Sequence, residues 1–262
     1  MVRVARTARA LLLLVAPAEA LGPARLLVAG RRGTVKAVRL ERVRAGSRLV
    51  NRAGHRIRQR LPGLAVDEAG RRAFVVEPGL VAEVDLDRLS VSHHDLADQP
   101  PAQAVHSKGA DGRTRIAHWL GGGVLAVSGA DEGRGRVRPA GLSLVDTRSW
   151  TARTIDRDAT DVVAAGDVLL AVGAGRPSTG RSAIGLAAYA LDGVERFRLL
   201  AGREAWVQEV YGGRAYVGVT RADGRQEALR VVELASGRVV GRHHGPLPWL
   251  VLDTPASWWE SP

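Results

Sequence analysis

The sequence predicts an all-β protein made of repeated four-stranded units, and three observations lead to this prediction. Short runs of Val, Leu, Ala and aromatic residues alternate with Gly, Asp and Arg turns every eight to twelve residues, and helical periodicity is almost absent. The 262 residues are 45% hydrophobic and 25% charged, which allows a large core and excludes disorder. The same order of strands then returns along the chain.

The first twenty residues have the layout of a secretory signal peptide. Arg3, Arg6 and Arg9 precede an apolar run at 10–16, and the triplet 18–20 has small residues at both ends, so cleavage is expected after Ala20. The alternative is that the run forms an ordinary first strand. The run is too short to span a bilayer, and no later segment is long enough, so we expect no transmembrane segment.

A partial unit follows the leader. Residues 24–30, 33–40 and 55–61 supply a second, a third and a fourth strand, but nothing before them supplies a first. The segment LPWLVLD at 247–253 follows the last complete unit and has no successors. We predict that it pairs with residues 24–30 and closes the structure, which would remove open sheet edges.

Four complete units lie between these ends. Their third strands align when Asp85, Asp146, Ala190 and Glu233 are placed in register, at separations of 61, 44 and 43 residues. A period near 44 with four strands per unit is typical of β-propeller blades. We therefore predict a single β-propeller domain over 21–262 with five four-stranded blades. The blades are 24–61 plus 247–253, 62–96, 115–156, 159–200 and 205–244.

The clearest unit carries a family resemblance. Its sequence GLAVDEAGRRAFVVEPGLVAEVDLDRLSV, at 63–91, resembles the YVTN-type repeat of the WD40-like β-propellers, and residues 205–240 are similar to a lesser degree. Glu77 stands where that family has an Asn, and its members often have seven blades. The resemblance implies a propeller but no single activity, because propellers host binding, signalling and enzymatic roles.

The long connections of the predicted blades fall on one face, which we call the long-loop face. They are 97–114, 129–139, 174–181 and 221–227, whereas the turns of the opposite face are short. The formal charge is +11, and guanidinium groups suit carboxylates and phosphates. The alternative is that these are solvated loop charges in a chain rich in arginine. The candidate ligand-binding residues are Arg134, Arg136, Arg138, Arg176, Arg181, Arg221, Arg225 and Lys108.

Signals for catalysis, metal or cofactor binding are poor. The chain has no Cys, no nucleophile elbow, no zinc-protease motif and no nucleotide loop. The pairs His93-His94 and His243-His244 are adjacent on strands, where neighbours point to opposite faces. We expect no catalytic residue, no metal and no cofactor. Carboxylates on first strands leave open a metal-dependent, lactonase-like hydrolase. They are Asp67, Asp161, Glu209 and Asp253.

The remaining features bear on partners. Aromatic residues make up only 4% of the chain and do not interleave with basic runs, so nucleic acid is not favoured. We expect Trp119, Trp206 and Trp150 to fill space between blades. The sequence thus favours a non-catalytic binding or protein-interaction module whose partner is an unknown protein or an anionic polymer. Its location is secreted, periplasmic or cell-envelope, or cytoplasmic if residues 1–20 are not a leader.

Overall fold

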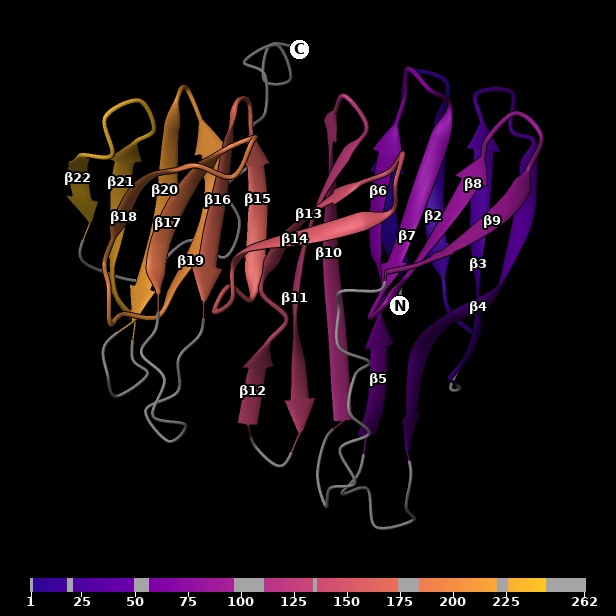
Figure 1. The fold of residues 1–262 in the computed structure, drawn as a ribbon, viewed down its shortest axis with the longest axis horizontal. Coiled ribbons are helices and arrows are strands. Elements are labelled where there is room, and N and C mark those ends of the chain that lie inside the picture. The colour runs from indigo at the N-terminus through magenta and orange to yellow at the C-terminus, as the bar shows by residue number, and fades with distance from the viewer. Residues whose placement is uncertain are drawn as a thin grey trace, which may run out of the picture. The chain divides into compact units, whose positions relative to one another are not determined.

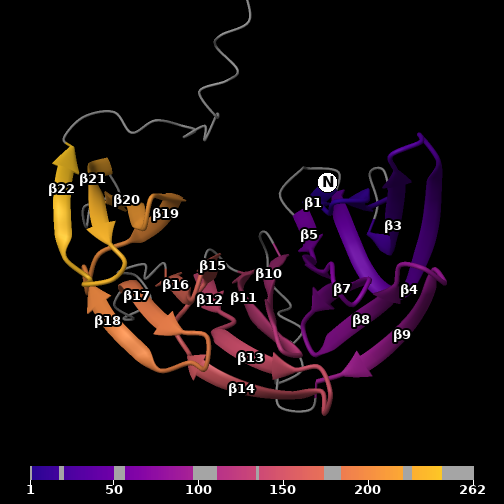
Figure 2. The same ribbon diagram turned by 90° about the horizontal axis from the view of Figure 1, so that it is seen from above.

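The computed structural model of the chain consists of β-sheets that follow one another along the sequence (Figures 1 and 2). The structure describes residues 2–17, 21–49, 57–96, 111–133, 136–173, 184–220 and 226–243. Within these residues all elements of regular structure are β-strands, so the predicted all-β class is confirmed. The chain divides into two compact units, Met1–Ala164 and Ala165–Pro262, which we describe separately.

The first unit begins with four antiparallel strands in chain order. They are β1 (Val2–Arg6), β2 (Ala10–Val15), β3 (Gly22–Gly30) and β4 (Val35–Leu49). In β2, Leu12 and Leu14 are buried, whereas Leu11 and Leu13 on the other face are half-buried. The apolar run of the expected leader therefore forms a strand in this structure, which was the alternative for these residues. The export of the protein stays a prediction.

The strand order of this sheet corrects the predicted first blade. Both edges of β3 are occupied, because β2 pairs along one side and β4 along the other. Since β3 contains residues 24–30 and already has a partner on each side, the predicted pairing of residues 247–253 with residues 24–30 is wrong. The physical reason is that β2 lies next to β3 in the sequence and forms a local pair, which sequential strands commonly do. Residues 247–253 themselves lie outside the described residues.

The next sheet is covered by sheets on both of its faces. It consists of β6 (Gly63–Asp67), β7 (Arg72–Glu77), β8 (Leu80–Asp85) and β9 (Ser90–Asp95). Ala73, Val75 and Ala82 on one face join a core with Leu12 and Leu26. The other face joins a second core in which Phe74, Val76 and Val81 lie with Leu125 and Val145. A sheet packed on both faces is the arrangement expected of a propeller blade.

The third sheet of this unit is joined to the first by a short strand. Its strands are β10 (Asp111–Gly121), β11 (Val124–Gly133), β12 (Arg136–Pro139), β13 (Leu142–Asp146) and β14 (Thr151–Asp156). The joining strand β5 (Ile57–Leu61) pairs antiparallel with the end of β4 and parallel with β10. Residues 55–61 were predicted to be the fourth strand of the first blade, whereas β5 pairs with both β4 and β10 and so connects two sheets. Residues 129–139 were predicted to be a loop, but β11 and β12 form a paired extension there.

The remaining strands form two four-stranded antiparallel sheets. The first contains β15 (Asp161–Ala165), β16 (Val168–Gly173), β17 (Gly185–Ala190) and β18 (Glu195–Leu199). The second contains β19 (Ala205–Tyr211), β20 (Arg214–Thr220), β21 (Gln226–Glu233) and β22 (Val239–His243). Trp206 of β19 lies across Gly218 of β20, where a Cβ would come within 2.3 Å of the indole ring. No helix among the described residues could cross a membrane.

The predicted register of the third strands is confirmed. Asp85, Asp146, Ala190 and Glu233 are the last residues of β8, β13, β17 and β21. In three of the hairpins that follow, the residue four positions later has a positive φ, and its N–H donates to the carbonyl of the strand's last residue. These residues are Leu89 (φ 57°, 2.8 Å), Trp150 (φ 56°, 2.7 Å) and Gly237 (φ 67°, 2.9 Å). In these three units, the backbone conformation of the turn is therefore repeated as well as the order of the strands.

Candidate functional site

A row of charged residues crosses four adjacent strands at one end of the first unit. Arg60 of β5 is in register with Arg113 of β10, Arg113 is paired with Asp131 of β11, and Asp131 is paired with Arg138 of β12. Residues that are directly opposite in a sheet point to the same face, so these four side chains form one row. We call Arg60, Arg113, Asp131 and Arg138 the charged row. It lies at the end of the strands where the long connections were predicted.

Arg115 adds a buried guanidinium beside this row. It lies two residues after Arg113 on β10, so both side chains are on the same face. Arg115 is only 4% exposed, and its Nη1 donates to Asp131 Oδ1 at 2.9 Å and to the Thr114 carbonyl at 2.9 Å. Its Nε is buried and has no hydrogen-bond partner among the described residues. A buried donor without a partner is costly, so a ligand that accepted from it would gain affinity.

Glu77 is the second carboxylate of this site. It is the last residue of β7 and is half-buried, and the backbone N–H of Arg44 donates to its carboxylate. Burial raises the pKa of Glu77 to about 7, although the charges of Arg60, Arg113 and Arg115 act to lower it. Among the described side chains of this site, the charges of Arg60, Arg113, Arg115 and Arg138 outnumber those of Asp131 and Glu77, and Glu77 is half-ionised near neutral pH. The site has an excess of positive charge.

A small pocket adjoins the charged row. Arg3 and Arg60 line it together with Ala45, Gly46 and Pro62. Arg3 also connects β1 to β10, because its Nη2 donates a hydrogen bond to the Arg115 carbonyl at 3.3 Å. The arginines of the site thus border a hollow as well as the sheet face.

The predicted ligand residues are only partly placed by the structure. Arg138 is exposed in the charged row, and Arg136 begins β12, where it pairs with Gly133. The other six lie outside the described residues. They are Arg134, Arg176, Arg181, Arg221, Arg225 and Lys108. Arg60, Arg115 and Glu77 were not among the predicted site residues, although Arg58-x-Arg60 and Arg113-x-Arg115 have the two-residue period of a strand face.

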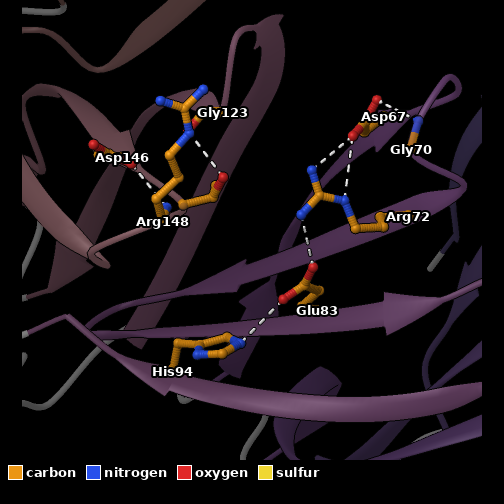
Figure 3. Close-up of polar contacts among 9 residues, drawn as sticks. Asp67, Gly70, Arg72, Glu83, His94, Gly123, Asp146 and Arg148 are labelled. Carbon is orange, nitrogen blue, oxygen red and sulfur yellow. Dashed lines mark hydrogen bonds and ion pairs between the residues drawn. The ribbon is translucent and has the colours of Figure 1, made fainter.

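A different polar cluster crosses the β6–β9 sheet from its short-turn end, where Asp67 and Arg72 lie (Figure 3). Arg72 donates to Asp67 at 2.8 Å and to Glu83 at 3.0 Å, and Glu83 lies 3.2 Å from His94 Nε2. Asp67 also accepts from the N–H of Gly70. We call these four side chains, Asp67, Arg72, Glu83 and His94, the ion chain.

Aromatic rings cover the ion chain. The guanidinium of Arg72 lies 5.3 Å from the ring of Phe74 and 5.5 Å from the ring of Trp119, which stack on one another. His94 stacks on Trp150 with ring centroids 3.6 Å apart. These contacts join the β6–β9 sheet to β10 and to the β13–β14 turn, as expected for Trp119 and Trp150. Because each member already has a hydrogen-bond partner within the cluster, we assign the ion chain a structural role.

Among the described residues, the histidines lie on separate strands or on opposite faces of one strand, and none belongs to a group of three side chains that could hold a metal ion. His94 belongs to the ion chain, whereas His93 is on the other face of β9, where burial lowers its pKa. His118 Nε2 lies 2.9 Å from the Val162 carbonyl, which supports a packing role. His243 ends β22, and His244 lies outside the described residues.

The carboxylates of the alternative enzyme are not brought together. Asp67 is held by Arg72, and Asp161 is half-buried with a pKa raised mainly by burial. Glu209 accepts from the N–H of Val210, and Asp253 is not described. Within the described ranges, no three His, Asp or Glu side chains lie close enough to hold a metal ion.

Comparison with known proteins shows the fold only. No protein-family model matches the sequence, and no curated protein matches it. The structure is similar to that of the dihydro-heme d1 dehydrogenase NirN, with 15% identity and a TM-score of 0.50, over 95% of this chain and 47% of that one. This likeness agrees with a fold of the β-propeller type.

Two further solved structures are similar at lower scores. A chain of the mitotic checkpoint complex is 12% identical, with a TM-score of 0.49, over 89% of this chain and 60% of that one. A TolB-like protein from Agrobacterium tumefaciens is 14% identical, with a TM-score of 0.39, over 70% of this chain and 60% of that one. The present chain therefore spans about half to three fifths of the length of these three structures.

Proposed function

We propose that this protein is a non-catalytic binding module that recognises an anionic group at the charged row. The observation that carries the proposal is Arg115, a buried guanidinium with an unpartnered Nε, next to Arg60 and Arg113. The backbones of neighbouring strands lie about 5 Å apart, so two arginines that are opposite each other in a sheet can hold their guanidinium groups close together. Two of them can therefore grip one phosphate, sulfate or carboxylate group.

The difference in exposure along the charged row suggests the side from which a ligand would approach. Arg138 is exposed on β12 at one end of the row, while Arg115 is buried on β10. An anion of a larger molecule would enter past Arg138 and end between Arg60, Arg113 and Arg115. An anionic polymer or an acidic protein segment would present such groups, and both were expected as partners from the sequence.

Binding of sulfate is the direct test. Isothermal titration calorimetry compares the wild-type protein with the double variant Arg60→Gln/Arg113→Gln. The matched control is Arg31→Gln/Arg32→Gln, which removes the same charge from an exposed turn between β3 and β4. We expect at least a tenfold loss of affinity in the first variant and less than twofold in the control. Equal losses in both variants would show that only the overall charge matters.

Three finer points of the proposal rest on the sequence. We propose that the repeat is of the YVTN type, which the segment at 63–91 supports, and that the protein has five blades, which the four-strand period near 44 residues supports. We propose an envelope or extracellular location, which the basic and apolar N-terminal residues support. Mass spectrometry of the protein from its native cells tests the location, because export with cleavage would leave Leu21 as the first residue.

A further inference from the structure

We propose that the small pocket beside Arg3 binds a monatomic anion such as chloride. The pocket lies within the first unit and is lined by residues of β1, β2, β4 and β5 and of the β5–β6 connection. The inference goes beyond the proposed function, because the ligand is a different one and because Arg3, on which the inference rests, is not part of the charged row.

Arg3 carries a hydrogen-bond donor that has no acceptor. Its side chain is half-buried, and its Nη2 donates to the Arg115 carbonyl at 3.3 Å, which holds the guanidinium against β10. Its Nε is buried and has no hydrogen-bond partner in the described part of the chain. The charge of Arg3 reaches Asp161 of β15, whose pKa is raised mainly by burial, but no hydrogen bond or ion pair joins these two described side chains. An acceptor placed at Nε would remove the cost of this unpaired donor.

The lining of the pocket favours a ligand that accepts hydrogen bonds and carries negative charge. Besides Arg3 and Arg60, the lining consists of apolar residues and one glycine, which are Leu14, Ala16, Ala45, Gly46, Leu61 and Pro62. None of these eight side chains contains a hydrogen-bond acceptor. Arg60 Nη1 donates to the Gln59 carbonyl at 3.0 Å, so we count Arg60 as a nearby positive charge and not as a free donor.

The size of the pocket restricts the ligand further. The space open to the centre of a water molecule is about 10 Å³, which is room for one water or one ion of similar size. A sulfate group has five heavy atoms and is too large. A water molecule fits, but it also has two protons to donate, and the side chains of the pocket offer no acceptor for them. A halide ion only accepts, and the two guanidinium groups balance its charge.

The site depends on the first two strands of the chain. Removal of residues 1–20 as a leader would take away Arg3, Leu14 and Ala16. The tests therefore use the full-length protein, in which β1 and β2 are part of the fold.

Bromide is a suitable probe for the position of the ion, because it replaces chloride and scatters X-rays anomalously. In crystals of the full-length protein grown in sodium bromide, we expect an anomalous peak in contact with Arg3 Nε inside the pocket. A pocket that holds a water molecule without anomalous signal, or bromide peaks at exposed arginines only, would overturn the inference.

Thermal unfolding tests the same site in solution. The melting temperature in about 100 mM sodium chloride is compared with that in sodium gluconate, which has the same ionic strength but an anion too large for the pocket. With a Kd of about 10 mM, chloride should raise the melting temperature of the wild type by about 3–6 °C relative to gluconate. Arg3→Gln should abolish this difference between the salts, whatever its own stability.

The matched control is Arg6→Gln, which removes the same charge from an exposed position on β1. It should keep the chloride effect of the wild type. The inference is wrong if the wild type melts at the same temperature in both salts, or if Arg3→Gln keeps the difference. These results leave the charged row untouched, because that site is tested separately by sulfate binding to the wild type and to Arg60→Gln/Arg113→Gln.

Discussion

Glu77 and Arg72 lie at opposite ends of β7, and they differ in how well their charges are balanced by neighbouring groups. Arg72 has two carboxylates within 3.0 Å, one of which, Asp67, has a side chain only 8% exposed. Glu77 has several positive charges around it, yet burial dominates and raises its pKa. A fully satisfied ion pair supports the fold, whereas an incompletely satisfied carboxyl makes the fold sensitive to pH.

Glu77 should make the protein less stable as the pH rises. Its pKa rises from 4.5 to about 7 on folding. The stability that comes from its protonation is therefore complete below about pH 4.5 and is lost as the pH rises through about 7. Glu77→Gln should raise the free energy of unfolding by about 1–3 kcal/mol at pH 8 relative to its effect at pH 4.5. Urea unfolding at the two pH values measures this, and an equal effect at both would contradict it.

Arg72 should be far more important to stability than its neighbour Arg71. Arg72→Ala leaves Asp67 buried without its cation and removes the contacts with Phe74 and Trp119. We expect a loss of about 2–4 kcal/mol. Arg71 pairs with the exposed Asp87, so Arg71→Ala should cost less than about 1 kcal/mol. Denaturant unfolding compares them, and similar losses would mean that the ion chain does not join the sheets.

At the scale of strands, the pattern of the sequence predicted most elements but not all of their neighbours. The four strands at 62–96 and the ends of the third strands at Asp85 and Asp146 were found as predicted, because alternation and turn residues are local signals. The partner of β3 was missed because the apolar run at 10–15 also fits a leader. The parallel pairing of β5 with β10 joins residues far apart in the sequence, and no local signal reports it.

The candidate site was predicted in part for the same reason. Arg113, Asp131 and Arg138 belonged to the expected charged connections, and the structure brings them into one row. Arg60 and Glu77 come from strands β5 and β7, which reach that row only through the fold. No local pattern of the sequence signals such a convergence, because the residues are far apart along the chain.

The strand β2 gives a test of its own at this scale. Leu12 is fully buried in the core with β3 and β4, whereas Leu11 is on the other face and half-buried. We expect Leu12→Ala to cost about 2–5 kcal/mol and Leu11→Ala clearly less, because a cavity forms only at the first site. Thermal unfolding of the purified full-length variants measures both. Two small and equal effects would argue that this strand does not belong to the folded core.

At the scale of the whole molecule, the charge of +11 produces a positive field that is separate from the local site. This field attracts any polyanion, falls off within about 10 Å at moderate salt and depends on the total charge rather than on geometry. The arginine-rich composition therefore predicts a background of unspecific binding, on which the charged row adds a specific part.

A heparin column separates these two contributions. The variants Arg60→Gln/Arg113→Gln and Arg31→Gln/Arg32→Gln lower the net charge by the same amount. If the field dominates polymer binding, both variants should elute at the same salt concentration, below that of the wild type. Earlier elution of the first variant alone would show that the charged row also governs the polymer.

The parallel pairing of β5 with β10 works as a reversible cross-link. It fastens the two ends of the segment that contains the β6–β9 sheet, from Leu61 to Asp111. With its ends held, that segment gains less conformational entropy when it unfolds, as in a loop closed by a disulfide. Backbone amides of β7 and β8 should therefore exchange with deuterium more slowly than those of β20 and β21, and weakening β5 should speed them up first.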